Sequence, residues 1–313
     1  MSRPLRIEYP GAFYHVINRG LERREIFRSK QDYEYFLGQL LQLHEKYDLL
    51  VYSYCLMPNH YHLYLETPNG HLSKIMRQLD GHYTQKFNKK YARVGPLMQG
   101  RYKAVLIEKD NYSLQLSKYI HLNPVKAKVV KTPEEFVWSS YQAYIGKSET
   151  PDFLKTNWLL GQFNKSAKKA RKAFKQFTLQ DMDQDWSPEK EVYKGFILGD
   201  SDFISQIQDT YLVGKSDPEI PKLKVAQKQL LPEELWKLIS SFKIDEKTAN
   251  KLFIFALKKY SSLTLNEIGV VAGGLTYMAI SKIAQRMEEK TNGDKKLRIL
   301  IHKISEFYKL SNV

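Results

Sequence analysis

Cysteine, long apolar runs and a secretory leader are all scarce or missing in this sequence. A single cysteine among 313 residues excludes an internal disulfide, and Cys55 lies in the apolar run 49–57, where a buried thiol is expected. No run approaches the roughly 18 consecutive apolar residues of a membrane-spanning helix. The first residues also lack the apolar core of a secretory signal. We therefore expect a cytoplasmic protein without a membrane partner.

Acidic residues are few relative to basic ones. The chain has 34 acids against 49 lysines and arginines, a formal charge of +15. Such an excess attracts a polyanion, of which nucleic acid is the obvious candidate. Charge alone is equally compatible with a basic surface that serves solubility or with an anionic membrane surface. A hydrophobic fraction of 42% argues against disorder, and the length suits two domains.

The first half of the chain alternates between strand and helix periodicity. Alternating or apolar runs predict strands, and apolar residues at helical spacing predict the helices between them. The expected order is strand 13–18, helix 32–47, strands 49–57 and 60–66 around a turn at Pro58-Asn59, helix 71–91, strand 103–108 and helix 111–121. This order predicts an α+β fold with a ferredoxin-like, split βαβ antiparallel sheet backed by helices.

Three segments follow from the change in pattern along the chain. Residues 1–146 form the α+β domain, and residues 147–231 form a connector whose structure the pattern does not define. A basic patch at 165–175 lies within this connector. Residues 232–313 return to helical periodicity without a strand signal, which predicts an all-α domain.

Two histidines in one strand are the first candidates for chemistry. His60 and His62 are two residues apart, so a strand would present both imidazoles on the same face. Such a pair can chelate a metal, although strand histidines are more often ordinary packing or surface residues. The pair alone therefore leaves both interpretations open.

Tyr119 and Asn123 form the second candidate group. They are four residues apart and project from the same face of a helix, with Pro124 placing Asn123 in the last turn. A tyrosine hydroxyl can attack phosphorus and become covalently attached, and a nearby amide oxygen can complete a metal shell. Without the histidine pair, a core tyrosine next to an Asn-Pro helix stop is the simpler interpretation.

Three motifs together carry a resemblance to a known family. MPNHYHL at 57–63, QGRYK at 99–103 and YIHLNPVK at 119–126 resemble, in this order and spacing, the signature of the single-tyrosine HUH, or IS200-like, transposases. Within that family the chain is most similar to the transposases associated with repetitive extragenic palindromes. The resemblance covers residues 9–144 and implies the HUH endonuclease fold.

The resemblance implies a specific chemistry. It makes Tyr119 the nucleophile and His60, His62 and Asn123 the ligands of Mg²⁺ or Mn²⁺. The substrate would be single-stranded DNA with hairpin or palindromic structure, nicked and rejoined through a 5′-phosphotyrosine in DNA transposition and recombination. Basic and amide side chains near the motifs are expected to hold the DNA, namely Asn18, Arg19, Arg23, Arg77, Arg101, Lys103 and Lys126.

Residues 232–310 carry the pattern of a helix-turn-helix. Thr264 and Glu267 form a capping box, Gly273-Gly274 forms the turn, and Thr276 can cap the second helix. The segment resembles the DnaA-type domain that binds duplex DNA. We expect Met278 to turn inward, and the residues expected to face the DNA groove are Tyr277, Ser281, Lys282 and Arg286.

Other functions remain open at this point. A non-catalytic DNA-binding regulator would keep the basic surface without needing both motifs, and a replication initiator or relaxase would share the HUH chemistry. A module that binds RNA is a third alternative, since ferredoxin-like sheets also bind single-stranded RNA. The sequence leaves a monomer and a homodimer equally open.

Overall fold

The computed structural model describes the chain except for residues 1–5, 181–185, 213–229, 262, 292 and 311–313. The chain divides into two compact units, Arg6–Ile204 and Ser205–Val313, and each has a hydrophobic core of its own. No helix in the described part of the chain is both long and apolar enough to span a bilayer.

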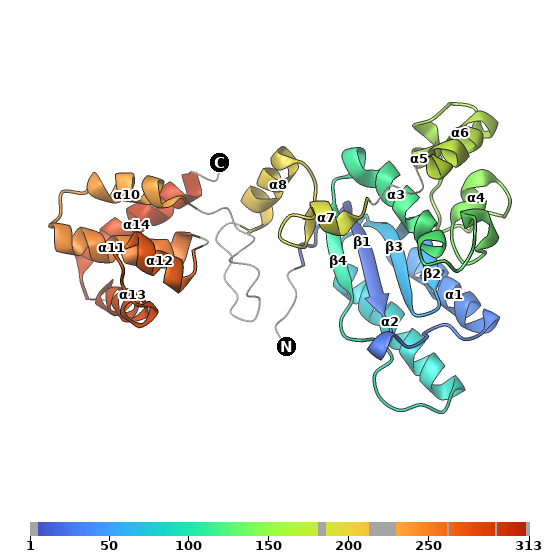
Figure 1. Cartoon of the computed structure of the whole chain (residues 1–313), viewed down its shortest axis with the longest axis horizontal. Helices are drawn as coiled ribbons and strands as arrows, with labels where there is room; N and C mark the ends of the chain where they lie inside the picture. The colour runs from blue at the N-terminus through green and yellow to red at the C-terminus, as the bar shows by residue number, and fades with distance from the viewer. Residues whose placement is uncertain (1–5, 181–185, 213–229, 262, 292, 311–313) are drawn as a thin grey trace. The chain divides into compact units, whose positions relative to one another are not determined.

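The first unit is built on a five-stranded sheet (Figure 1). Its strands are β1 (Ala12–Arg19), β2 (Leu50–Met57), β3 (His60–Thr67), β4 (Lys103–Ile107) and β5 (Ile197–Leu198), in the order β2-β3-β1-β4-β5. The first four pair antiparallel, whereas β5 adds to β4 in parallel. With α1 (Lys30–Tyr47) after β1 and α2 (Leu72–Lys90) after β3, this is the ferredoxin-like α+β fold that the sequence predicts.

Alternate residues of β3 face opposite sides of the sheet. Tyr61 packs against Phe36 of α1, with ring centroids 5.0 Å apart, and its hydroxyl donates to Asp80 Oδ1 of α2 at 2.7 Å, so α1 and α2 cover this face. The other face is covered by α3 (Lys109–Lys126), where Ser117 Oγ lies 2.6 Å from Ser53 Oγ of β2. Because His60 and His62 alternate with Tyr61, both lie on the α3 side.

Helix α3 extends beyond its expected end. The sequence predicts an end near His121, but the helix runs to Lys126 with Pro124 inside it. Proline lacks an N–H and therefore removes one hydrogen bond of the ladder, without preventing the turns that follow. Ala127 N–H donates to the Asn123 carbonyl at 2.9 Å, and Val129 N–H donates to the Pro124 carbonyl at 2.9 Å. Asn123 consequently lies in the last full turn, as expected.

Residues 133–204 complete the first unit. They form η2 (Pro133–Glu135), α4 (Tyr141–Ile145), α5 (Asn157–Gly161), α6 (Ala167–Leu179), α7 (Pro188–Glu191), β5 and the start of α8 (Ser201–Ile207). Helix α6 packs on α4, α5 and α3. Phe174 of α6 stacks on Tyr144 of α4 with 4.6 Å between ring centroids, and both belong to the core beneath α3. The segment 147–204 is therefore packed against the sheet unit.

The described residues of the second unit form helices and the turns between them. After α8 and η3 (Gln208–Leu212) come α10 (Pro232–Ser240), α11 (Glu246–Tyr260), α12 (Leu265–Val271), α13 (Tyr277–Thr291) and α14 (Lys295–Leu310) (Figure 1). One apolar cluster contains buried residues from all five helices α10, α11, α12, α13 and α14. Gly273 and Gly274 connect α12 to α13 with φ angles of +88° and +87°, a conformation that favours glycine. The capping box of Thr264 and Glu267 opens α12.

Candidate active site

The histidine pair begins β3, directly after the turn at Pro58-Asn59. His60 pairs across the sheet with Arg19 of β1, and His62 pairs with Ile17. The two imidazole centroids are 5.0 Å apart, and the His60 Nδ1 lies 2.6 Å from the Asn59 Oδ1. Burial, assisted by the charge of Arg19, lowers the pKa of His60 to about 4. Both rings are therefore neutral near pH 7, as metal ligation requires.

A third histidine, which belongs to none of the sequence motifs, joins the pair. His15 of β1 places its Nε2 3.0 Å from the Nδ1 of His62, and the two rings stack with centroids 5.2 Å apart. Both side chains are buried. Burial lowers the pKa of His15 to about 3 and, together with the neighbouring His15, His60 and Arg19, depresses that of His62 strongly. Strand alternation in 13–18 would have placed His15 on this face once the β1–β3 pairing was known.

Tyr119 of α3 lies directly above these rings. Its ring meets His62 edge-on at 5.8 Å and His15 at 6.0 Å between centroids. Burial raises the pKa of its hydroxyl to about 12, with Glu189 acting in the same direction. A hydrogen bond from the Asn123 side chain and the charge of Arg19 act in the opposite direction. The structure therefore brings the expected nucleophile and the histidine pair together.

Asn123 lies one turn beyond Tyr119 on the same face of α3. Its Nδ2 donates to the Tyr119 carbonyl at 2.9 Å, so its amide oxygen is the end available to a cation. Within the described ranges, no group of three histidine, cysteine, aspartate or glutamate side chains could hold a metal ion. An ion on the histidine pair would therefore depend on a neutral donor such as Asn123.

One side of Tyr119 is in contact with Trp186, a residue from a distant part of the sequence. The ring of Trp186 meets Tyr119 edge-on at 5.8 Å, and its Nε1 donates to Glu191 Oε1 at 2.7 Å. Lys126 binds the Trp186 carbonyl at 3.1 Å and lies 5.5 Å from the centre of the Tyr119 ring. The sequence around Trp186 carries no motif, so only the folded chain reveals this contact.

His121 lies on the opposite side of α3 from Tyr119. It is fully buried and its Nε2 is 2.7 Å from Ser140 Oγ. The rings of Tyr144 and Phe174 lie 5.3 and 5.8 Å away between centroids. His121 is thus part of the core and does not reach the candidate site.

The residues expected to bind DNA differ in exposure. Asn18 is buried, and its Nδ2 donates to Asp80 Oδ2 at 2.9 Å. Tyr102, which lies between the expected DNA-binding residues Arg101 and Lys103, is also buried beneath Arg6, so it offers no open surface for a base. The six basic side chains are exposed, namely Arg19, Arg23, Arg77, Arg101, Lys103 and Lys126.

The helical unit presents its expected groove-facing residues on α13. Tyr277, Lys282 and Arg286 are exposed and Ser281 is half-buried. Met278, expected to turn inward, is 58% exposed because the buried positions of α13 are Ile280, Ala284 and Met287. The buried stripe follows the spacing 280, 284 and 287, which leaves position 278 outside it.

Two transposase-related chains are among the solved structures that this chain resembles. One is a REP-associated tyrosine transposase bound to a REP hairpin, with 18% identity, a TM-score of 0.41 and coverage of 50% of this chain and 92% of that chain. The other is a protein of Deinococcus radiodurans R1 with a proposed transposase assignment, with 17% identity, a TM-score of 0.27 and coverage of 38% and 94%. Neither likeness supports a functional conclusion at a TM-score below 0.5.

A comparison with curated proteins found no match. A comparison with protein families matched residues 9–123 to the model described as "Transposase IS200 like". That segment is little more than a third of the chain, and it contains His15, His60, His62, Tyr119 and Asn123. Over this segment, which holds these five residues, the chain is similar to the IS200-like transposases.

Proposed function

We propose that this chain is a metal-dependent, single-tyrosine transposase that nicks and rejoins single-stranded DNA. One observation carries the proposal: the ring of Tyr119 lies 5.8 Å from that of His62, on the sheet face that also bears His60. A tyrosine beside two neutral imidazoles can act on a phosphodiester whose charge is balanced by a cation. The similarity of residues 9–123 to IS200-like transposases supports a role in DNA processing.

The residues around Tyr119 fit a divalent cation. Two imidazole nitrogens each about 2.1 Å from one ion would leave their rings close to the observed centroid separation of 5.0 Å. His15 occupies the Nδ1 of His62, so the Nε2 of His62 is the nitrogen left for an ion. His60, His62 and the amide oxygen of Asn123 would hold Mg²⁺ or Mn²⁺, and such an ion would polarise the phosphate.

The proposed strand cleavage is one exchange of bonds at phosphorus. The Tyr119 Oη attacks phosphorus, the bond from phosphorus to the 3′ oxygen breaks, and the 3′ oxygen leaves with a proton as a hydroxyl. Tyr119 loses its proton in the same exchange, so the product is a 5′-phosphotyrosine that conserves the diester bond energy. With the pKa of Tyr119 raised to about 12, the hydroxyl enters the reaction protonated, and the positive charge of Arg19 favours the phenolate that develops.

DNA contacts are proposed for both units. In the sheet unit, the exposed cations Arg19, Arg23, Arg77, Arg101, Lys103 and Lys126 would bind phosphates of a single strand with hairpin or palindromic structure. In the helical unit, α12, the Gly273-Gly274 turn and α13 would act as a helix-turn-helix on duplex DNA. Tyr277, Lys282 and Arg286 are the residues we expect at the groove.

The decisive experiment is a covalent trap. The full chain and Tyr119→Phe are incubated with end-labelled hairpin oligonucleotides in Mn²⁺, Mg²⁺ or EDTA and resolved on denaturing gels. We expect a metal-dependent adduct that carries the strand on the 3′ side of the cut, through its 5′ phosphate, and vanishes in Tyr119→Phe. Tyr112→Phe changes another half-buried tyrosine of α3 and should leave the adduct intact. An adduct that survives in Tyr119→Phe would refute Tyr119 as the nucleophile.

A non-catalytic DNA-binding regulator is the competing function. It is favoured if hairpin DNA binds tightly but no adduct forms under any condition. The helical unit is tested separately by replacing Tyr277, Lys282 and Arg286 with alanine in the full chain. We expect weaker binding to duplex DNA with unchanged adduct yield on a single-stranded substrate, and unchanged duplex affinity would remove the proposed role of α13.

A further inference from the structure

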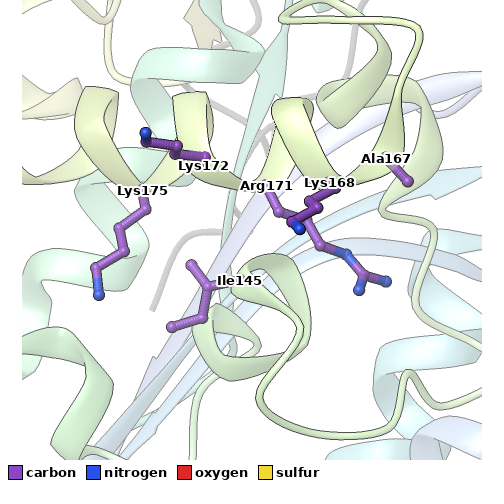
Figure 2. Close-up of a pocket in the computed structure, with 6 residues that line it drawn as sticks. All are labelled: Ile145, Ala167, Lys168, Arg171, Lys172 and Lys175. Atoms are coloured by element: carbon purple, nitrogen blue, oxygen red, sulfur yellow. The ribbon is translucent and has the colours of Figure 1, made fainter.

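A basic groove lies between α6 and the end of α4, away from Tyr119. It has a volume of about 630 Å³ and is lined by Ile145, Ala167, Lys168, Arg171, Lys172 and Lys175. Figure 2 shows Ile145 between the side chains of Arg171 and Lys175, with the other cations along α6. The four cations are spaced i, i+3, i+4 and i+7, so they share one face of the helix.

Most of these cations form no ion pair with a described residue that would stabilise the fold. Lys175 pairs with Glu134 Oε1 at 2.6 Å, and Lys147 pairs with Glu134 Oε2 at 3.2 Å. Lys168, Arg171 and Lys172 are exposed, and among the described residues none has an acidic side chain within ion-pair distance. Like charges at this spacing destabilise a helix by a few tenths of a kcal/mol per pair. The stripe therefore weakens α6 unless an anion binds to it.

The folded core also does not need these side chains. Helix α6 is held by a separate stripe, Ala170, Phe174 and Thr178, which is buried. Phe174 packs against His121 of α3, and His121 faces away from Tyr119. The groove consequently lies on the side of α3 away from Tyr119, apart from the residues that would act on the phosphate.

We propose that this α6 groove binds the phosphate backbone of the DNA stem that continues beyond the cleaved strand. From Lys168 to Lys175 the stripe is about 10 Å long at 1.5 Å per residue, which matches about three nucleotide steps of a duplex strand at 3.4 Å each. The contacts would be to phosphates alone, so they add affinity without reading sequence. The proposal rests on the proposed function only in taking DNA as the substrate.

The test compares two charge-matched variants in full chains that also carry Tyr119→Phe, so that binding is separated from chemistry. The first is Lys168→Gln with Arg171→Gln and Lys172→Gln. The second is Lys46→Gln with Lys86→Gln and Lys89→Gln, which removes three exposed charges from α1 and α2 on the other face of the sheet. The dissociation constant for a long-stem hairpin is measured over a range of salt concentrations, and thermal unfolding verifies that each variant folds.

Loss of three phosphate contacts should reduce the magnitude of the log–log salt slope by about 2.7, at about 0.9 per contact. The parental Kd should then rise about 40-fold more than that of the α6 variant between 50 and 200 mM salt. The α1/α2 variant should keep the parental slope, as should Lys168→Arg with Arg171→Lys and Lys172→Arg.

Equal slopes in the two neutralised variants would overturn the proposal. The proposal would also be overturned if the α6 variant kept the parental salt slope for DNA but lost binding to anionic vesicles. That result would make the groove a membrane contact. The covalent trap is independent of these measurements. An absent adduct with a reduced salt slope in the α6 variant would refute the proposed nucleophile and leave the α6 groove as a DNA site.

Discussion

His121 offers a quantitative test of the core beneath the nucleophile helix. Burial lowers its pKa to about 3 from the 6.5 of an exposed imidazole. A histidine whose folded-state pKa is depressed contributes stability that is fully present above pH 6.5 and is lost as the pH falls toward 3. Between pH 7 and pH 5 the unfolded chain binds a proton at this residue and the folded chain does not, which costs the folded state about 2 kcal/mol.

His121→Gln removes this titration while retaining an amide that can bond to Ser140. The lost ring contacts with Tyr144 and Phe174 lower the stability by the same amount at every pH, so only the pH dependence is diagnostic. Between pH 7 and pH 5, we expect the free energy of unfolding of the variant to fall by about 2 kcal/mol less than that of the parent. His82→Gln changes a histidine on the exposed side of α2 and serves as the matched control.

The assay is urea unfolding at pH 7, 6 and 5 in EDTA, followed by tryptophan fluorescence. The chain has four tryptophans, and only Trp236 lies in the helical unit. A Trp236→Phe background therefore restricts the signal to the sheet unit, which avoids mixing two unfolding transitions. Parallel pH dependences for the parent and His121→Gln would refute the assignment of a neutral, buried imidazole.

Three further predictions concern other residues of the sheet unit. His15→Phe should lower Mn²⁺ affinity roughly 10- to 100-fold, because it removes the partner of the His62 Nδ1; electron paramagnetic resonance titration would measure this, and an unchanged affinity would exclude a positioning role. Burial raises the pKa of the Asp80 carboxyl to about 6. The protonated side chain therefore contributes to the free energy of unfolding at low pH, and this contribution is lost as the pH rises from about 4 to 6. Asp80→Asn should flatten the stability profile in that window by at most about 3 kcal/mol, and a profile identical to the parent would contradict this. Gly146 has φ +75°, which a residue with a Cβ rarely adopts, so Gly146→Ala should cost about 1–2 kcal/mol in thermal unfolding. The Arg171 side chain, whose Nη1 would lie 2.6 Å from the added Cβ, can move aside.

The sequence predicted the sheet well because its strands carry their own signal. In a strand over residues 60–66, positions two apart share a face, and this spacing alone placed His60 and His62 together. His15 was missed because its position depends on the pairing of β1 with β3, which local periodicity does not encode. The extent of α3 was also missed, since Pro124 is an ordinary helix stop in sequence and is accommodated in the structure by bonds further along the chain.

The segment 147–204 was the least predictable part of the sheet unit. Helices of four or five residues such as α5 and α7 are stabilised by the surfaces they pack on, so their sequences have no period to detect. Trp186 illustrates the same limit at the site, because its contact with Tyr119 joins residues that are 67 positions apart. The basic patch at 165–175 was visible in the sequence, but its alignment along one face of α6 required the helix bounds.

The two-residue strand β5 limits where the chain can be truncated without exposing a strand edge. Leu106 N–H donates to the Phe196 carbonyl and Glu108 N–H donates to the Leu198 carbonyl, each at 2.8 Å. A fragment ending at residue 146 would leave this side of β4 with unpaired backbone donors next to an apolar core, a surface that invites strand addition from another chain. Polymers joined edge to edge through β4 are the expected product of such a fragment, whereas one that retains β5 keeps this side of β4 closed.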